Sequence, residues 1–367
     1  MGNVGTIKAT INSAAAMKKQ GYDVKIYRIY REWEGYEDLL NKYGIELVDF
    51  ELSKKFATLP SKGIGFRFSM ILLSLLSIGP LKKNWNEEKP DIIIASLLGY
   101  LPLVVRRLSK YKPTIINSIQ GRPKLHKVRK LLWKLLYAKS DLLITLSEET
   151  QNEIVSKLGF AKERVVRLDN PVIDEQIDCL MEEPLDDKDV KEPFILGVGR
   201  LTRQKDFSTL IRAFAEFGKE NPEEKLLILG EGEEREKLES LVKELNISER
   251  VILKGFVKNP YKYMHRADVF VLSSLWEDAG HVMLEAAYVK APIVSTRCPS
   301  GQEEFLDYGE AGELCEVANA HDMAECIQKV KMRENDAKVE RAYQKALLYT
   351  MDRHGENLDL IIKSLVK

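Results

Sequence analysis

The sequence predicts an α/β protein with two doubly wound, Rossmann-like domains, and three observations support this fold class. At 367 residues, the chain is too long for one ordinary hydrophobic core. Short apolar runs alternate with longer helix-like segments, which is typical of parallel sheets covered by helices. An acidic stretch with little periodicity, residues 174–192, lies near the middle of the chain and is predicted to be a linker.

The predicted N-terminal domain covers residues 1–173. Its strands are expected at 24–29, 45–50, 91–96, 114–119, 142–146 and 165–168, and its helices at 6–20, 66–86, 101–111, 125–139 and 148–158. A doubly wound domain normally opens with a strand that leads into a glycine loop, whereas no strand precedes Gly2 and Gly5 here. A first strand is therefore expected to be missing, either because the true chain begins upstream, which we favour, or because this domain lacks that strand.

The predicted C-terminal domain covers residues 193–345. Its strands are expected at 194–198, 225–229, 251–254, 269–272 and 292–295, and its helices at 207–220, 233–245 and 281–288. Residues 346–367 form a helical tail that is expected to pack back on the N-terminal domain.

Charge is divided unequally between the two halves, although the net charge is zero. Residues 1–170 hold 29 Lys and Arg against 17 Asp and Glu, so the remainder is equally acidic. This asymmetry suggests an anionic partner for the first half, such as an acidic membrane surface, a phosphorylated lipid or nucleic acid, unless both surfaces are merely solvated. We expect peripheral contact with an anionic membrane and no nucleic-acid partner.

One basic segment gives this expectation a location. Arg122, Lys124, Lys127, Arg129 and Lys130 run into the apolar and basic segment 131–137, which could lie on an anionic surface as a helix. The alternative is that its leucines belong to the core. The longest apolar run, 68–78, is too short to span a bilayer, and the residues after Met1 do not read as a secretory signal.

Four cysteines without paired spacing and five scattered histidines predict reduced thiols and no metal site. The expected location is cytoplasmic, at the inner face of the plasma membrane.

Three segments of the second half have the residue types that bind an anionic ligand. In residues 197–207, a strand ends in glycines and turns through Arg200 and Lys205 into a helix, where cations and helix amides stabilise phosphate. A solvated basic turn explains this segment equally well. In the second segment, Gly230 and Gly232 follow another strand, as in any tight turn.

The third segment, residues 273–287, is the most specific. A strand leads to a loop with Glu277, and a helix begins near Gly280 with Glu285 about one turn inside it. The amides of His281, Val282 and Met283 could receive a diphosphate, with Glu285 beside them for ribose hydroxyls. Taken alone, Glu285 could be an ordinary acid on a solvated helix.

The combination Gly-x-Gly-Arg-Leu-x-x-x-Lys, Gly-x-Gly, Ser-Ser-x-x-Glu-x7-Glu-Ala and Pro-Ile-Val-Ser-Thr, spaced over residues 194–317, resembles the family 4 glycosyltransferases of GT-B fold. The first half resembles them more loosely, at residues 21–24, 90–94, 140–147 and 170–171. The resemblance implies two domains that face each other across a cleft. It also implies a retaining, metal-independent transfer from a nucleoside diphosphate sugar, by default a UDP-sugar, to a saccharide or lipid-linked saccharide in bacterial surface glycan assembly.

The resemblance also implies roles for individual residues. Arg200 and Lys205 would hold the diphosphate, Glu277 would contact or support the donor sugar, and Glu285 would bind ribose. The backbone at Lys254, Gly255 and Phe256 would hold the base. The remaining donor-binding residues are expected to be Gly5, Gly199, Gly230, Gly232, Gly280, His281, Val282 and Met283.

Two departures from the family pattern stand out. Asp278-Ala279-Gly280 replaces the usual Gly-Phe-Gly, which leaves the sugar open, and Gln120-Gly121 occupies the place of a frequent histidine, so Gln120 receives no role. The alternatives are a GT-B epimerase of nucleotide sugars, a hydrolase, and a donor-binding scaffold without activity.

Overall fold

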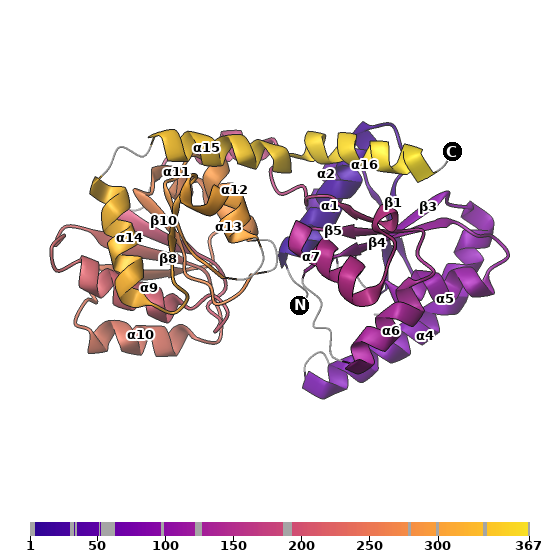
Figure 1. The fold of residues 1–367 in the computed structure, drawn as a ribbon, viewed down its shortest axis with the longest axis horizontal. Coiled ribbons are helices and arrows are strands. Elements are labelled where there is room, and N and C mark those ends of the chain that lie inside the picture. The colour runs from indigo at the N-terminus through magenta and orange to yellow at the C-terminus, as the bar shows by residue number, and fades with distance from the viewer. Residues whose placement is uncertain are drawn as a thin grey trace. The chain divides into compact units, whose positions relative to one another are not determined.

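The structure is a computed structural model that divides into two compact units (Figure 1). The N-terminal unit comprises Met1–Pro171 and Met351–Lys367, and the C-terminal unit comprises Val172–Thr350. The structure describes residues 4–29, 33, 35–50, 52, 63–96, 99–121, 127–185, 193–277, 280–298, 301–332 and 336–365. Among these residues, no helix is both long enough and apolar enough to cross a membrane.

Two parallel sheets form the centre of the N-terminal unit. The strands β1 (Lys25–Arg28) and β2 (Glu46–Asp49) pair with each other, and a second sheet has the order β3 (Ile92–Ala95), β4 (Thr114–Ile119), β5 (Leu142–Thr145) and β6 (Val165–Arg167). The six predicted strands are thus present with small shifts at their ends. In the described residues they form two hydrogen-bonded sheets instead of one.

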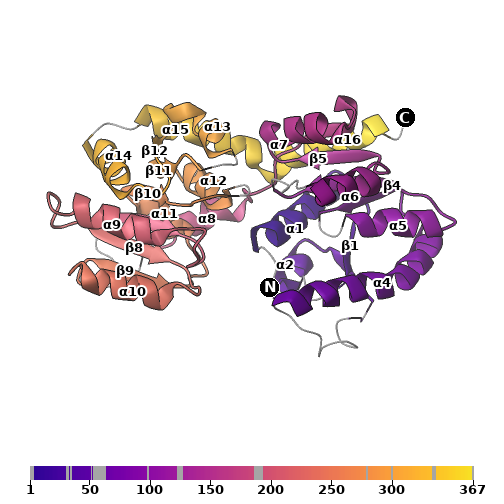
Figure 2. The ribbon, with the colours of Figure 1, turned by 60° about the horizontal axis from the view of Figure 1, so that its bottom comes forward.

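Helices cover both faces of the four-stranded sheet (Figure 2). On one face, α1 (Val4–Lys19) and α16 (Met351–Leu365) pack together, and Met17 and Leu358 share an apolar cluster with Ile116 of β4. The opposite face carries α4 (Gly63–Glu88), α5 (Tyr100–Leu108), α6 (Lys127–Tyr137) and α7 (Glu148–Glu153), which continues into a π-helical turn at Ile154–Leu158. The short helix α2 (Glu37–Lys42) precedes β2, and a 3-10 turn at Lys162–Arg164 precedes β6.

The start of α1 corrects one prediction. Gly5 was expected in a glycine loop, but it lies in the first turn of α1, which begins at Val4. The helix begins so early because Ile7, Ile11 and Ala15, at helical spacing, are buried against the rest of the unit. Gly2 lies outside the described residues.

A single six-stranded parallel sheet forms the centre of the C-terminal unit, with the order β12-β11-β10-β7-β8-β9. Its strands are β7 (Phe194–Val198), β8 (Lys225–Leu229), β9 (Val251–Gly255), β10 (Val269–Leu272), β11 (Ile293–Thr296) and β12 (Glu313–Cys315). Its helices are α8 (Gln176–Met181), α9 (Phe207–Phe217), α10 (Arg235–Glu244), α11 (Tyr261–Arg266), α12 (His281–Tyr288), α13 (Gln302–Phe305), α14 (Ala320–Met332) and α15 (Asp336–Ala346). The order reverses at β7 and β10, which places a topological switch point between these two strands.

The predicted linker and tail differ in their bounds from the structure. Within 174–192, residues 174–185 belong to the C-terminal unit, because α8 buries Ile177 completely in its core, and residues 186–192 lie outside the described part. The tail joins the N-terminal unit from Met351 and not from residue 346, since Ala346 is buried in the C-terminal core. In the N-terminal unit, the hydroxyl of Tyr22, in the segment after α1, donates a 2.8 Å hydrogen bond to Asp359 of α16.

Candidate functional site

Two glycine-containing loops pack backbone to backbone at the carboxyl ends of β7 and β8. The amide of Gly199 donates to the carbonyl of Leu229 at 3.0 Å, and the amide of Leu201 donates to that of Glu231 at 2.9 Å. A Cβ on Gly230 would lie 1.8 Å from the carbonyl oxygen of Gly199, and one on Gly232 would lie 2.2 Å from that of Leu201. Both positions therefore require glycine for the loop contact itself, whatever ligand approaches the loops.

Lys205 and Glu277 form a buried ion pair at the same end of the sheet. The ammonium of Lys205 lies 2.5 Å from Oε1 of Glu277, and the two side chains are only 14% and 7% exposed. Ser274 also donates to that carboxylate oxygen. The sequence predicts separate ligands for these two residues, a phosphate and a sugar, whereas the structure joins them in one charged centre.

Two hydrogen bonds fix the loop after β7 against the loop after β10, and a third joins the loop after β10 to β11. Ser273 donates to the carbonyl of Lys205 at 2.7 Å, the amide of Leu275 donates to the carbonyl of Gln204 at 2.8 Å, and Thr296 at the end of β11 donates to the carbonyl of Ser274 at 2.6 Å. Because β7 and β10 are neighbours in the sheet, residues about seventy positions apart in the sequence meet here. The ion pair is thus held by backbone contacts on both sides.

Cys298, which follows β11, is buried close to this centre. Burial raises the pKa of its thiol to about 11, and the charge of Glu277 acts in the same direction. A thiol with such a pKa stays protonated at neutral pH and reacts poorly. Cys298 is therefore a buried, neutral thiol close to Glu277.

The N-terminus of α12 follows the predicted pattern with one correction. Gly280 precedes α12 with φ of 57°, a left-handed conformation that glycine adopts without strain. The amide of Met283 donates to the carbonyl of Gly280 at 2.8 Å, so it is not available to a diphosphate as predicted. His281 and Val282, whose amides the sequence assigned to the same diphosphate, lie at the first two positions of α12.

Glu285 lies in the second turn of α12 and is half-buried. The hydroxyl of Tyr261, a buried residue at the start of α11, donates to its Oε1 at 3.0 Å. The sequence did not single out Tyr261, because a tyrosine in a short helix has no motif of its own. Asp278 and Ala279, on which the departure from the family pattern depends, lie outside the described residues.

The other predicted residues lie in the loop after β7 and at the end of β9. Arg200 is exposed, and its guanidinium has no hydrogen bond or ion pair with the side chains and backbone that the structure describes. Gly255 ends β9 with φ of 86° and accepts from the amide of Gly230 at 2.8 Å, Lys254 precedes it, and Phe256 is 80% exposed. No three His, Cys, Asp or Glu side chains gather as a metal site within the described ranges.

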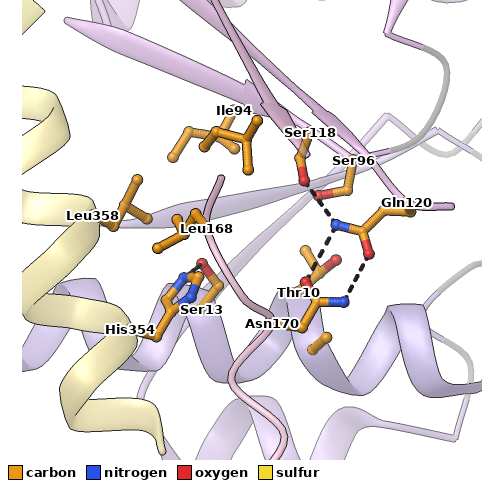
Figure 3. Close-up of a pocket in the computed structure, with 12 residues that line it drawn as sticks. Thr10, Ser13, Ile94, Ser96, Ser118, Gln120, Leu168, Asn170, His354 and Leu358 are labelled. Atoms are coloured by element: carbon orange, nitrogen blue, oxygen red, sulfur yellow. Dashed lines mark hydrogen bonds between the residues drawn. The ribbon is translucent and has the colours of Figure 1, made fainter. Parts of the chain in front are cut away.

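The N-terminal unit contains a polar pocket of its own, with a volume of about 30 Å³ (Figure 3). It lies at the carboxyl ends of β3 and β4, beside α1 and α16. Gln120 and Asn170 exchange hydrogen bonds of 2.9 and 3.4 Å across its wall, and Gln120 also donates to Ser118 at 2.7 Å. The sequence assigned Gln120 no role, and Asn170 lies 50 positions away from it in the chain, so no motif shows the pocket.

His354 of α16 lines the same pocket and is buried. Its Nε2 lies 2.8 Å from the hydroxyl of Ser13, and its Nδ1 lies 2.7 Å from the carbonyl of Asp169. Burial lowers the pKa of His354 to about 4, because the interior disfavours a charged imidazole. The pocket is therefore neutral at physiological pH, with hydroxyl, amide and imidazole groups as its polar lining.

Comparison with known proteins assigns the chain to a family. Residues 5–176 match the model described as Glycosyltransferase Family 4, and residues 184–346 match Glycosyl transferases group 1. The chain belongs to glycosyltransferase family 4. It is 29% identical over 311 residues to the N-acetylgalactosamine-N,N'-diacetylbacillosaminyl-diphospho-undecaprenol 4-alpha-N-acetylgalactosaminyltransferase of Campylobacter jejuni, which covers 83% of this chain and 82% of that protein.

A second relative is a lipopolysaccharide core biosynthesis glycosyltransferase of Rhizobium meliloti, 29% identical over 68% of each chain. Among solved structures, a glycosyltransferase of Rickettsia africae has a TM-score of 0.78 at 16% identity and covers 99% of this chain and 95% of its own. The Anabaena protein HepE, solved in complex with UDP, has a TM-score of 0.77 at 16% identity, covering 98% and 96%. These likenesses confirm the predicted GT-B fold of this family 4 enzyme.

Proposed function

We propose that this glycosyltransferase moves a sugar from a UDP-sugar to a saccharide or lipid-linked saccharide acceptor, with retention of configuration and without a metal. The donor proposal is supported by HepE, which was solved with UDP, and the acceptor proposal by the Campylobacter relative, whose name specifies an undecaprenol-linked acceptor. The proposed setting is bacterial surface glycan assembly, in the cytoplasm and at the inner face of the plasma membrane.

The buried pair of Lys205 and Glu277 is the observation that carries the proposal. A lysine beside a carboxylate at the switch point of a parallel sheet presents a positive charge where a diphosphate would bind. In this mechanism, Arg200 and Lys205 neutralise the charge that grows on the leaving diphosphate, so that no metal is required. Glu277 fixes the lysine and faces the donor sugar as positive charge develops on it.

The remaining roles follow from position. Glu285, oriented by Tyr261, would accept hydrogen bonds from ribose hydroxyls, and the amides at the start of α12 would meet a phosphate. Phe256 and the backbone at Lys254 and Gly255 would contact the base. In a retaining transfer without a protein nucleophile, a leaving phosphate oxygen would take the proton of the attacking acceptor hydroxyl.

Binding and product analysis test the proposal in two steps. Isothermal titration with UDP, GDP and ADP should show selective binding of UDP in the wild type and weaker binding in Arg200→Ala and Glu285→Ala. Nuclear magnetic resonance of the product should then show the anomeric configuration of the donor. Wild-type affinity in both variants would reject this donor site, and an inverted product would reject retention alone.

A further inference from the structure

The outer surface of α4 and α6 in the N-terminal unit is unusually apolar. These two helices, with α5 between them in contact with both, form a layer on the sheet whose outer side faces away from the strands (Figure 2). The described residues expose fourteen large apolar side chains, and six of them lie on α4 and α6. This concentration contrasts with the scattered single exposed residues that are normal on soluble proteins.

The four exposed apolar residues of α4 lie on one side of the helix. Ile71, Leu72, Leu75 and Leu76 are spaced at i, i+1, i+4 and i+5, and Leu75 is 62% exposed. The buried side of α4, with Leu73, Ser77, Leu81 and Trp85, packs toward the sheet, so the exposed side is not left over from an incomplete core. Lys82 and Lys83 are exposed one to two turns further along the same side.

The helix α6 repeats this pattern with more charge. Leu131 and Leu135 are 59% and 65% exposed and lie on one side of the helix together with the exposed Lys127 and Lys134. The alternative interpretation of the sequence, in which these leucines are core, is thus wrong for Leu131 and Leu135. The whole segment 63–137 contains fourteen Lys and Arg against three Asp and Glu, which accounts for most of the basic excess of the first half.

We infer that this α4–α6 surface docks on an anionic lipid bilayer. Its leucine and isoleucine side chains would enter the boundary between headgroups and acyl chains, while the surrounding lysines would meet the acidic headgroups. A second copy of the chain is a poorer occupant, because two surfaces with the same strong positive charge repel each other. Nucleic acid is also a poorer occupant, since aliphatic side chains offer no stacking platform to bases.

Flotation with lipid vesicles tests the inference without any need for turnover. The full chain is mixed with vesicles of equal parts phosphatidylglycerol and phosphatidylethanolamine, or of phosphatidylcholine alone, at low and high salt. We expect binding to the anionic vesicles that weakens with salt, and little binding to phosphatidylcholine. Wild-type protein that stays unbound at low salt would overturn the inference.

Paired variants assign the contact to the helices. Ile71→Asn/Leu75→Asn should lower vesicle partitioning more than tenfold, whereas Leu360→Asn, equally exposed on α16 of the same unit, should change it less than twofold. Lys127→Gln/Lys134→Gln should lower partitioning by about 25-fold, at about fivefold for each lysine, and reduce its salt dependence. The matched control Lys219→Gln/Lys243→Gln, at two exposed lysines of the C-terminal unit, should leave vesicle partitioning and its salt dependence unchanged.

Analytical ultracentrifugation and UDP titration of the same variants complete the test. All variants should remain folded and bind UDP as the wild type does, because none lies in the donor site. Equal loss of flotation in test and control variants would overturn the inference. So would an α4 variant that floats normally but loses self-association, which would make this surface an interface between copies of the chain. Failure of UDP binding in every protein would instead reject only the proposed donor.

Discussion

Each unit buries a polar centre near the carboxyl end of its sheet, but the two centres differ in charge. The C-terminal unit holds Lys205 and Glu277 as an ion pair with side chains at most 14% exposed. The N-terminal unit holds His354 neutral, between Ser13 and the carbonyl of Asp169, next to the amide pair of Gln120 and Asn170. A charged centre can stabilise the negative charge of a diphosphate. Neutral hydroxyl and amide groups instead form hydrogen bonds without attracting ions.

The largest effect is expected from breaking the charged centre. Lys205→Met leaves the Glu277 carboxylate buried without its cation, which should destabilise the C-terminal unit by about 3–5 kcal/mol. It should also lower turnover about 100-fold or more, because the charge that is proposed to stabilise the leaving group is lost. The measurements are hydrogen exchange of the C-terminal unit and initial rates with a UDP-sugar.

A control variant separates these two effects. Lys331 lies 2.6 Å from the equally buried Glu224 in the same unit but away from the loops of the site. Lys331→Met should therefore cost similar stability with turnover of the folded fraction unchanged, while Lys205→Met/Glu277→Gln should regain stability but not turnover. Equal losses of turnover from both single variants would mean that the pair is merely structural.

The backbone contact beside the charged centre should give the next largest effect. In Gly230→Ala, the methyl group would meet the carbonyl oxygen of Gly199 at 1.8 Å, at a φ of 147° that disfavours any side chain. We expect a loss of about 3 kcal/mol or more in the free energy of unfolding and weaker UDP binding, because the loop with Arg200 must move.

Gly309→Ala is the matched control for that variant. Gly309 also has a positive φ, 111°, but a Cβ there meets nothing within 4 Å. Gly309→Ala should lower the free energy of unfolding by about 1 kcal/mol, from backbone strain alone, and leave UDP affinity unchanged. If urea unfolding gives the same loss for both variants, the loop contact does not matter.

The neutral centre should make the stability of the N-terminal unit depend on pH. Because the pKa of His354 is lowered from 6.5 to about 4 in the native state, the unfolded chain binds more protons between these values. Stability of the N-terminal unit should therefore fall as pH drops through this window, by up to about 3 kcal/mol, and be fully present above it. His354→Gln should lose this component of the slope.

Tryptophan fluorescence isolates that measurement. Trp33, Trp85 and Trp133 lie in the N-terminal unit and Trp276 in the other, so urea unfolding in a Trp276→Phe background reports on the N-terminal unit. An unchanged slope between pH 6.5 and 4 in His354→Gln would contradict the neutral assignment.

The smallest effect is expected at Tyr261. Tyr261→Phe removes one hydrogen bond to Glu285 and should raise the KM for the donor about three- to tenfold, with kcat within twofold. Tyr288→Phe removes a similar bond, 2.9 Å long, to Asp178 in the same unit and should change neither constant. Steady-state kinetics decide the matter, and a change confined to kcat would contradict a positioning role.

The sequence predicts the charged centre better than the neutral one for a physical reason. Lys205 and Glu277 are charged residues at the ends of apolar strands, a pattern that is visible in short stretches, and their types indicate phosphate chemistry. Their direct contact was not predictable, because it depends on β7 and β10 being neighbours in the sheet. Ser13, Gln120 and His354 come from three distant segments, so only the folded chain brings them together.

The same contrast applies to secondary structure. Eleven of the twelve strands in the described residues were predicted from the alternation of apolar runs with helix-like segments, whereas β12 was not. The helix α8 was taken for a linker, since its acidic surroundings conceal the buried Ile177. The exposed apolar side chains of α4 were also not predictable. An apolar run indicates burial, and only the fold shows which side of the helix faces the sheet.

The position of α16 has a consequence for biosynthesis. The N-terminal unit is split into two stretches of chain, with the whole C-terminal unit, Val172–Thr350, inserted between them. On the ribosome, the earlier unit must therefore wait for α16, which closes over Met17 and places His354 in its pocket, while the inserted unit can complete its core first. The order of folding during translation is thus expected to run opposite to the order of the two units along the gene.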